Sequence, residues 1–499
     1  MKIQELFKKL VPDASIPKIP LEIKGLSENS KTVNKNFLFF ARKGTKNKGT
    51  DFIQEALKNG AIAICAEEKI LESSVPVISV PSVQEIEAPV ANRFYDNPSK
   101  NLCMVGVTGT NGKTTFTYLL EAIANEIGWK TGVIGTINYR LPKSDSNEIE
   151  ILPAPNTTPN ALELQFLLHT LRERKADLVI MEVSSHALSL NRVEGIEFDG
   201  AVFTNLTQDH LDYHENMENY FEAKLKLFKN LNSNKKESPQ AQNKFSILNM
   251  DDPYSQRIQL NSFLPVTGYG IKNKTDFSIE ELHLDPHGSS FILVAKDKKF
   301  PIHTQLLGEH NVYNILAAIA ASSQLKIPIL KAIKGIEKIK MIPGRLEKLI
   351  CGQNFNVVID YAHTEDALKN VLFSLKQFAP KRILTVFGCG GDRDRSKRPL
   401  MGAVAAAFSD WVILTSDNPR SEDPEKIILD IEVGVRRVGK NNYEIILDRE
   451  TAIEKILKSA RKDDLVLIAG KGHETVQIFK NQTVHFDDRE ITRKFLCKP

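Results

Sequence analysis

Residues 107–115 have the composition and spacing of a loop that binds phosphate groups. The segment Val-Thr-Gly-Thr-Asn-Gly-Lys-Thr-Thr follows an apolar run at 103–107 and precedes residues with helical spacing at 116–123. In a strand–loop–helix unit of this kind, backbone N–H groups and the positive end of the helix face the anion. Lys113 would add a mobile positive charge, and the hydroxyl of Thr114 can hold Mg²⁺.

The loop is a variant of the common phosphate-binding pattern. That pattern has a glycine five residues before Gly112, where this chain has Val107, and the first glycine of the loop is Gly109. A tight turn from strand to helix that binds no ligand is the alternative. The order Gly-Lys-Thr-Thr after a buried strand favours phosphate binding.

Two further residues are candidate metal ligands. Glu182 ends an otherwise apolar strand, and a carboxylate in that place can hold Mg²⁺ beside a phosphate loop. The alternative for Glu182 is a strand-end side chain that faces water. His210 is the weaker candidate, because a single histidine is more often a hydrogen-bonded structural residue; Asp209, Asp212 and His214 are alternatives to it.

Lys224 occupies an unusual place for a lysine. If residues 220–228 form a helix, its neighbours at spacings of three and four are Tyr220, Phe221, Leu227 and Phe228. Lys226 instead has Glu222, Ala223, Lys229 and Asn230 as neighbours and belongs to the solvent face. Lys224 would either extend its ammonium to water, which the residues alone favour, or have its pKa lowered by desolvation. A neutral amine could react with CO₂ to form a carbamate, which can bind metal as a carboxylate does.

The segment Asn156-Thr157-Thr158-Pro159 predicts the start of a helix over residues 162–171. We expect a threonine at the N-cap and Pro159 at the first helical position. Capping alone is one interpretation. Binding of an anion or carboxylate at the start of this helix is the other.

The elements that position these residues predict an α/β fold. Residues 1–98 contain a strand at 36–41, a helix at 52–57 and a strand at 61–65, which indicates a small α/β N-terminal domain. Residues 99–342 alternate strands with helices, which predicts a doubly wound, mostly parallel sheet with ligands at the carboxyl ends of its strands. The predicted strands of this central domain are 103–107, 131–137, 178–183 and 201–204.

A third domain, residues 343–499, is predicted to have a second parallel sheet. Apolar runs at 357–360, 383–387, 411–415 and 465–469 each end in a polar cluster. Such clusters gather at one edge of a parallel sheet. Two such edges that face each other would form a cleft between domains.

The composition indicates a globular protein of two to four domains. The 499 residues exceed what one core holds, and 41% hydrophobic and 26% charged residues are ordinary values. The net charge of +4 is too balanced to indicate a nucleic-acid or membrane partner. No apolar run has the length of a membrane span, and the N-terminal residues predict no signal peptide.

The five cysteines have no metal-ligand spacing. They are Cys65, Cys103, Cys351, Cys389 and Cys497. We expect all of them to be reduced thiols in a cytoplasmic protein. We also expect a monomer.

In their order along the chain, these motifs resemble the Mur ligase family of ATP-dependent peptidoglycan amino-acid ligases. Residues 108–115 resemble the family's ATP loop, and residues 182–188 and 204–214 resemble its central motifs. Glu-Ala-Lys at 222–224 matches the site of the family's carbamylated lysine, so the resemblance favours the carbamate for Lys224. It covers essentially the whole chain and implies three domains, the last of them Rossmann-like.

The resemblance assigns roles to residues at the nucleotide site. The implied ATP-binding residues are Gly109, Thr110, Asn111, Gly112, Lys113, Thr114, Thr115, Asn314, Arg345 and Asp360. The implied catalytic residues are Lys113, Glu182, His210 and Lys224. Thr114 and Glu182 would bind one Mg²⁺. His210 and the carbamate of Lys224 would bind a second metal, and CO₂ would supply the carbamate.

The resemblance also implies the other substrates. Within the family the chain is most similar to members that join meso-diaminopimelate to the D-Glu side-chain carboxylate of UDP-N-acetylmuramoyl-L-Ala-D-Glu. The implied contacts of this nucleotide-sugar dipeptide are Ser30, Asn156, Thr157, Thr158, Ser184 and Arg192. Those of diaminopimelate are Arg393, Asp417, Asn418, Pro419, Arg420, Gly470 and Glu474. The alternative is that Arg420 caps the turn at Asn418-Pro419 and forms an ion pair with Glu422 or Asp423.

The chain departs from the family pattern at several positions. Asn29 and Lys31 stand where the family usually has Asp and Arg, Leu190 replaces a polar residue, and Glu365 replaces a proline. The alternative functions are an L-lysine-adding ligase of the same family and a folylpolyglutamate synthase. A third alternative is a binding module with a vestigial nucleotide site. The presence of Lys113 argues against it.

Overall fold

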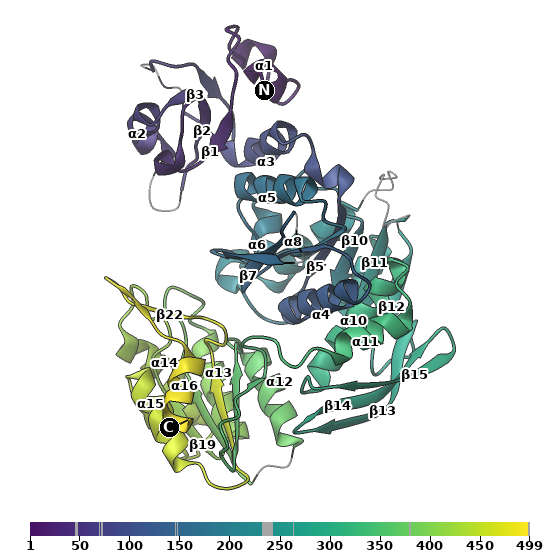
Figure 1. The fold of residues 1–499 in the computed structure, drawn as a ribbon. Helices are drawn as coiled ribbons and strands as arrows, with labels where there is room; N and C mark the ends of the chain where they lie inside the picture. The colour runs from purple at the N-terminus through teal and green to yellow at the C-terminus, as the bar shows by residue number, and fades with distance from the viewer. Residues whose placement is uncertain are drawn as a thin grey trace. The chain divides into compact units, whose positions relative to one another are not determined.

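The computed structural model of the chain describes residues 1–44, 48–68, 70, 73–144, 146, 148–231, 243–262, 264–378 and 381–497 (Figure 1). The chain divides into two compact units. The first unit comprises Met1–Gly106, Trp129–Ala201 and Ala223–Lys244. The second unit comprises Val107–Gly128, Val202–Glu222 and Phe245–Pro499.

The N-terminal part of the first unit is built on a four-stranded parallel sheet. The strands, in spatial order, are β1 (Gly25–Ser27), β2 (Phe37–Ala41), β3 (Ala61–Ala66) and β4 (Val77–Ser79). The helices are α1 (Ile3–Phe7), α2 (Ile53–Lys58) and α3 (Val83–Phe94). Apolar residues fill both faces of β2 and β3, as expected for parallel strands covered on both sides. The predicted small α/β domain is confirmed.

The largest sheet has 11 strands, and the division between the two units falls within its strands β5 and β10. The spatial order is β15-β14-β13-β12-β11-β10-β5-β9-β6-β7-β8. The first six in chain order are β5 (Cys103–Thr108), β6 (Thr131–Ile134), β7 (Asn138–Pro142), β8 (Ile149–Pro153), β9 (Leu178–Glu182) and β10 (Gly200–Phe203). The others are β11 (Phe245–Asn249), β12 (Val266–Tyr269), β13 (Phe277–Asp285), β14 (Gly288–Ala295) and β15 (Lys298–Thr304).

The predicted parallel sheet is confirmed for the middle of this sheet but not for its edges. Strand β9 pairs in parallel with β6, and β11 pairs in parallel with β12. At the edges, β7 and β8 form one antiparallel pair, and β13, β14 and β15 form an antiparallel meander. The alternating burial of β14 is typical of a strand with one solvated face.

The helices of the two units lie in the chain segments between the strands. They are α4 (Lys113–Glu126), α5 (Ala161–Glu173), α6 (Ser185–Ser189), α7 (Leu211–His214), α8 (Met217–Lys229), α9 (Tyr254–Leu260), α10 (Glu309–Gln324) and α11 (Ile329–Glu337). Within the second unit, α4 packs against α10 and α11. No helix in the described ranges has the length and apolar character needed to cross a membrane.

Helix α5 begins later than its sequence predicts. The expected start at Thr158 and Pro159 is wrong, because Asn160 is the N-cap residue and Ala161 the first helical residue. The side chain of Thr158 is engaged elsewhere, since its hydroxyl donates to the carbonyl of Glu182 at 2.8 Å. A tertiary contact therefore replaces the predicted cap.

The C-terminal part of the second unit is a six-stranded sheet between two helical layers. Its strands, in spatial order, are β16 (Glu347–Lys348), β17 (Asn356–Asp360), β21 (Leu465–Ala469), β18 (Ile383–Phe387), β19 (Trp411–Leu414) and β20 (Tyr443–Ile445). One core lies between the sheet and α12 (Glu365–Lys376), α13 (Lys397–Phe408) and α14 (Pro424–Arg437). The other core lies under α15 (Arg449–Ser459) and α16 (Asp488–Leu496), and the hairpin β22 (Val476–Ile478) and β23 (Thr483–His485) forms a small separate sheet. The four predicted strands are confirmed.

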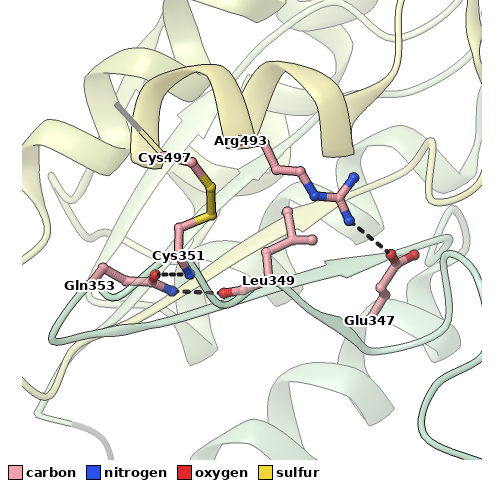
Figure 2. The surroundings of a disulfide bond; sticks show 6 residues. All are labelled: Glu347, Leu349, Cys351, Gln353, Arg493 and Cys497. Atoms are coloured by element: carbon pink, nitrogen blue, oxygen red, sulfur yellow. Dashed lines mark hydrogen bonds and ion pairs between the residues drawn. A yellow bond between two sulfur atoms is a disulfide. The ribbon is translucent and has the colours of Figure 1, made fainter. Parts of the chain in front are cut away.

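Two of the five cysteines form a disulfide, which corrects the expectation of reduced thiols. Figure 2 shows Cys497, directly after α16, bonded to Cys351, which follows β16. The two residues are 146 positions apart in sequence, with Cα atoms 5.2 Å apart. This pairing was not predictable from sequence, because folding alone brings the two segments together. Cys65, Cys103 and Cys389 are buried.

Candidate active site

The phosphate loop has a backbone that requires both of its glycines. Gly109 and Gly112 have φ angles of +150° and +88°. A Cβ atom on Gly109 would lie 1.9 Å from Oγ1 of Thr204, and one on Gly112 would lie 2.3 Å from Oδ1 of Asn314. Val107 lies in the buried strand β5, where no special backbone conformation is needed. The variant glycine spacing is therefore compatible with a tight loop at the start of α4.

Charged and hydroxyl side chains converge on this loop. The Lys113 ammonium donates to the carbonyls of Gly109 and Thr110 at 2.7 and 2.8 Å, so it lies over the loop. The Arg345 guanidinium donates to Oγ1 of Thr114 at 3.2 Å and lies 4.8 Å from the centre of the Tyr361 ring. Nε of Arg345 is buried and has no hydrogen-bond partner among the described residues. Such an unpaired donor beside a phosphate loop suits an anionic ligand.

A cavity of about 300 Å³ lies over the loop in the second unit. Predicted ATP-binding residues that line it are Asn111, Gly112, Thr114, Thr115, Asn314, Arg345 and Asp360. The opposite wall comes from the C-terminal part, where residues of α12 such as Asn370 and Phe373 contribute. The predicted cleft between the central and C-terminal parts is thus present around the phosphate loop.

Two residues hold the loop through contacts that were not predicted from the sequence. Oδ1 of Asn205 accepts from the backbone N–H of Asn111 at 2.9 Å. Asp366, in the first turn of α12, accepts from Nδ2 of Asn111 and from Oγ1 of Thr207, each at 3.1 Å. Asn205 lies in a predicted motif, but Asp366 is 255 positions from Asn111 and only folding reveals the contact.

Asp360 positions the backbone around Arg345. Its carboxylate accepts from the N–H groups of Leu346 and Ala362, both at 2.7 Å. Burial raises the pKa of Asp360, and the Arg345 charge partly offsets that rise. Burial also lowers the pKa of His310 to about 4, and Arg345 adds to this effect. His310 is therefore a neutral wall residue at neutral pH.

His210 lies in the second unit with Lys113 and Thr114. It precedes α7, has a φ angle of +55°, and its Nε2 is 3.3 Å from Oδ2 of Asp209. Its side chain is 40% exposed. A carboxylate partner of this kind can fix the orientation of an imidazole.

The predicted diaminopimelate residues come together on loops at one end of the six-stranded sheet. Nδ2 of Asn418 donates to Oε2 of Glu474 at 2.7 Å. A Cβ atom on Gly470 would lie 2.6 Å from Oδ2 of Asp417. The loop can therefore approach Asp417 this closely only because residue 470 is a glycine. Nη1 of Arg420 donates to the carbonyl of Gly391 at 2.8 Å.

The surroundings of Arg420 argue against the alternative of an ion pair with Glu422 or Asp423. Glu422 pairs with Arg398 at 2.8 Å, and Asp423 caps α14. In the described ranges Arg420 has no ion pair with a carboxylate. Burial, and next the charge of Arg393, lower the pKa of Arg420. Its half-buried guanidinium is therefore suited to an anionic group of a ligand. Pro419 is buried in the same loop, and Arg393 is exposed.

In the first unit, most of the predicted nucleotide-sugar residues form one hydrogen-bonded cluster. Oγ1 of Thr158 lies 3.3 Å from Oγ of Ser184 and accepts from the N–H of Ser184 at 3.0 Å. Arg192 donates to the carbonyl of Thr158 at 3.1 Å. Oγ1 of Thr157 is 3.0 Å from that of Thr136, and the Asn156 carbonyl accepts from the Tyr139 hydroxyl. Ser30 lies apart, bonded to Glu55 at 2.5 Å.

The two metal candidates of the first unit are buried. Glu182 is 1% exposed, and its carboxylate accepts from the N–H and the hydroxyl of Thr136 at 3.0 and 2.8 Å. Lys224, in α8, is 2% exposed, while Lys226 is exposed, which confirms the predicted helix faces. The prediction from the residues alone, that the Lys224 ammonium extends to water, is therefore wrong. No group of three or more His, Cys, Asp or Glu residues with metal-binding geometry occurs within the described ranges.

Three family descriptions match the chain. "Mur ligase middle domain" matches residues 107–322, "Mur ligase, glutamate ligase domain" matches 344–472, and "Mur ligase family, catalytic domain" matches 22–97. Together these segments cover most of the chain and include the phosphate loop, Glu182 and the loops around Arg420.

Individual relatives resemble the chain over nearly its whole length. The UDP-N-acetylmuramoyl-L-alanyl-D-glutamate–2,6-diaminopimelate ligase of Syntrophomonas wolfei is 44% identical over 497 residues, 99% of each chain. The protein of the same name from Geobacillus thermodenitrificans is 44% identical over 472 residues, 95% of this chain and 94% of that relative. A solved structure of a ligase with this name is 34% identical, has a TM-score of 0.66, and is matched over 99% of this chain and 98% of its own.

Proposed function

Because the chain belongs to the Mur ligase family, we propose that it uses ATP to join meso-diaminopimelate to the D-Glu side-chain carboxylate of UDP-N-acetylmuramoyl-L-Ala-D-Glu. This reaction extends a peptidoglycan precursor. The structural observation that carries the proposal is the cavity at the phosphate loop, with the unpaired Nε of Arg345 beside it. A nucleotide phosphate would supply the missing acceptor.

The reaction follows from the chemistry of the carboxylate, which is a poor electrophile. Transfer of the ATP γ-phosphoryl group to the D-Glu side-chain carboxylate would give an acyl phosphate and ADP. The amine of diaminopimelate would then attack the acyl carbon, and the tetrahedral intermediate would collapse to the amide and release phosphate. Lys113 would stabilise the charge on the transferred group, with the loop N–H groups as further donors. The cavity wall from α12 would restrict water, which would otherwise hydrolyse the acyl phosphate.

The candidate metal ligands fit Mg²⁺ by their chemistry. Thr114 and Glu182 offer hydroxyl and carboxylate oxygens, the donors that Mg²⁺ prefers. The buried Lys224 would become a carboxylate ligand through its carbamate, and His210 would add an imidazole. When bound, the metal would offset phosphate charge.

The amino acid would bind at the loops around Arg420. Diaminopimelate differs from lysine by one distal carboxylate, which the Arg420 guanidinium could bind through two parallel hydrogen bonds. Asn418 would add a donor at that end. The other end would contact Arg393, Gly470 and Glu474. An L-lysine-adding ligase is disfavoured, because lysine would leave Arg420 without an anion.

The three predicted domains give each substrate its own region. We place the boundaries near residues 98 and 342, so that 1–98 would bind the UDP-sugar, 99–342 ATP, and 343–499 the amino acid. The family matches that begin at residues 22, 107 and 344 support this division. The Thr158 cluster with Ser184 and Arg192 would bind the dipeptide part of the acceptor, and Ser30 the UDP part. We also propose a cytoplasmic monomer, consistent with the use of ATP.

The proposal is tested by release of ADP from purified protein under omission of each substrate in turn. We expect release only with ATP, the UDP-linked dipeptide and meso-diaminopimelate together, and much less with L-lysine. A folate acceptor with glutamate tests the folylpolyglutamate alternative. Release with folate, or none with the dipeptide acceptor, would overturn the proposal. A Lys113→Ala protein with intact thermal unfolding is the control and should release no ADP.

A further inference from the structure

We propose that Lys471 is a positioning residue that holds Asn418 and Glu474 in the orientation that receives the diamino acid. This inference rests on the proposed function and extends it to a residue without a predicted role. Lys471 follows β21 in the loop that carries Gly470 and Glu474, and its side chain is fully buried. A buried lysine needs partners for its charge, and the identity of those partners indicates its role.

Every N–H donor of the Lys471 ammonium is used inside the protein. Nζ donates to Oδ1 of Asn418 at 3.2 Å, to Oε2 of Glu474 at 3.1 Å and to the carbonyl of Val476 at 2.7 Å. An ammonium has three donors, so none remains for a substrate. Lys471 would therefore act through Asn418 and Glu474 and would not touch the substrate.

The contact with Lys471 fixes which way the Asn418 amide points. Oδ1 of Asn418 accepts from Nζ of Lys471 and from the N–H of Ile478 at 3.0 Å. Both partners are donors only, so the oxygen side of the amide must face them. The NH₂ group then faces Glu474, and its second N–H stays available for a carboxylate. Asn418 is 3% exposed, so its amide has little room to turn.

The same contact leaves one oxygen of Glu474 for the ligand. Oε2 accepts from both Asn418 and Lys471. Oε1 lies 3.5 Å from the Tyr361 hydroxyl, at the outer limit of a hydrogen bond, and the Glu474 side chain is 26% exposed. Oε1 is thus the oxygen that an ammonium group of the diamino acid would reach. The charge of Lys471 also balances that of Glu474 where water is scarce.

The test is steady-state kinetics of Lys471→Met, which keeps the apolar stem and removes the charge and the donors. We expect kcat/KM for meso-diaminopimelate to fall about 10- to 100-fold. KM for ATP and for the UDP-linked dipeptide should stay at wild-type values, because neither substrate depends on Asn418 or Glu474. Ile453→Val, in the core under α15, is the control for general destabilisation. It should leave all three KM values unchanged.

A double-mutant cycle separates positioning from a purely structural role. If Lys471 acts through Glu474, Lys471→Met in a Glu474→Gln background should reduce kcat/KM much less than it does alone. Independent effects that multiply, or an equal rise of all three KM values, would overturn the inference. If the Lys471→Met protein does not fold, Lys471→Gln, which keeps an N–H donor, takes its place. The same kinetic pattern is then required of the Lys471→Gln protein.

The wild-type protein distinguishes failure of the inference from failure of the proposed function. No ligation of diaminopimelate by the wild type would overturn the proposed function. Wild-type ligation together with an unchanged kcat/KM in Lys471→Met would overturn only the role of Lys471.

Discussion

At the scale of single residues, Arg420 is the side chain expected to select the amino acid. Its guanidinium is half-buried, and its Nη1 donates to the backbone carbonyls of Gly391 and Asn418. We predict that Arg420→Ala lowers kcat/KM for meso-diaminopimelate about 10- to 100-fold, the effect of losing a charged hydrogen-bonding partner in a closed site. Lysine, which lacks the distal carboxylate, should be used no worse than before.

The measurement is kcat/KM for both amino acids in wild type and variant. Arg395→Ala is the matched control, because Arg395 is exposed and pairs with Asp430 on the surface. An unchanged ratio of the two kcat/KM values in Arg420→Ala would show that Arg420 is not the discriminator.

The buried carboxyl group of Glu87 is expected to make the free energy of unfolding depend on pH. It lies in α3, is 1% exposed, and has an Arg42 nitrogen 3.4 Å from its carboxylate. Burial raises the pKa of Glu87 to about 8, although Arg42 opposes the rise. Between pH 4.5 and about 8 the folded state therefore binds more protons at Glu87 than the unfolded state, so this group makes stability fall as pH rises.

We predict that Glu87→Gln removes this loss. The free energy of unfolding of the variant minus that of the wild type should increase from pH 5 towards pH 8, as measured by urea denaturation. Glu85→Gln, exposed on the same helix, is the control and should give a flat difference. A flat or falling difference for Glu87→Gln would contradict the raised pKa.

The sequence predicts a residue's environment well when its neighbours are local. The burial of Lys224 and the exposure of Lys226 follow from helical spacing alone. The contacts of Asn111 with Asp366 and of Asn418 with Lys471 join distant segments, and nothing in local periodicity encodes them. The phosphate loop was therefore predictable, and the side chains that hold it in place were not.

At the scale of elements, predictions succeed for strands in the middle of sheets and fail at boundaries. Continuous apolar runs such as β18 are buried on both faces and were predicted to the residue. The predicted strand 131–137 ends early, at Ile134, because Gly135 and Thr136 turn towards the Glu182 carboxylate. Like the displaced start of α5, this boundary is set by a side chain elsewhere in the fold.

The disulfide joins two elements, and its removal has a predictable effect on stability. Helix α16 packs on the sheet through three apolar side chains other than Cys497, which are those of Ile491, Phe495 and Leu496. We therefore expect Cys497→Ser to fold, with a free energy of unfolding about 2–4 kcal/mol lower, because the cross-link restricts the unfolded chain. Thermal unfolding with and without reductant measures this. Wild type should lose stability on reduction and Cys497→Ser should not; identical behaviour of the two proteins would contradict the Cys351–Cys497 bond.

At the scale of the whole molecule, the proposed catalytic residues come from both compact units. Lys113, Thr114 and His210 belong to the second unit, while Glu182 and Lys224 belong to the first. We therefore expect substitutions at these residues to lower ligation, whichever unit they belong to.

We predict that Lys224→Ala abolishes most ligation and that formate or acetate partly restores it. A short carboxylate could occupy the place of the carbamate and supply the same oxygen donors. Lys226→Ala, on the exposed face of the same helix, is the control and should keep full activity. ADP release with and without added formate is the measurement. Full activity of Lys224→Ala, or no response to carboxylates, would argue against a carbamate.

In the proposed reaction, the acceptor's carboxylate is activated as an acyl phosphate and then forms an amide with meso-diaminopimelate. The most direct measurement uses acceptor labelled with ¹⁸O in the D-Glu side-chain carboxylate and mass spectrometry of the products. We predict one ¹⁸O atom in the released phosphate, and the other in the new amide of a product that contains diaminopimelate. Unlabelled phosphate would contradict the acyl phosphate, and a product without diaminopimelate would contradict the proposed amide.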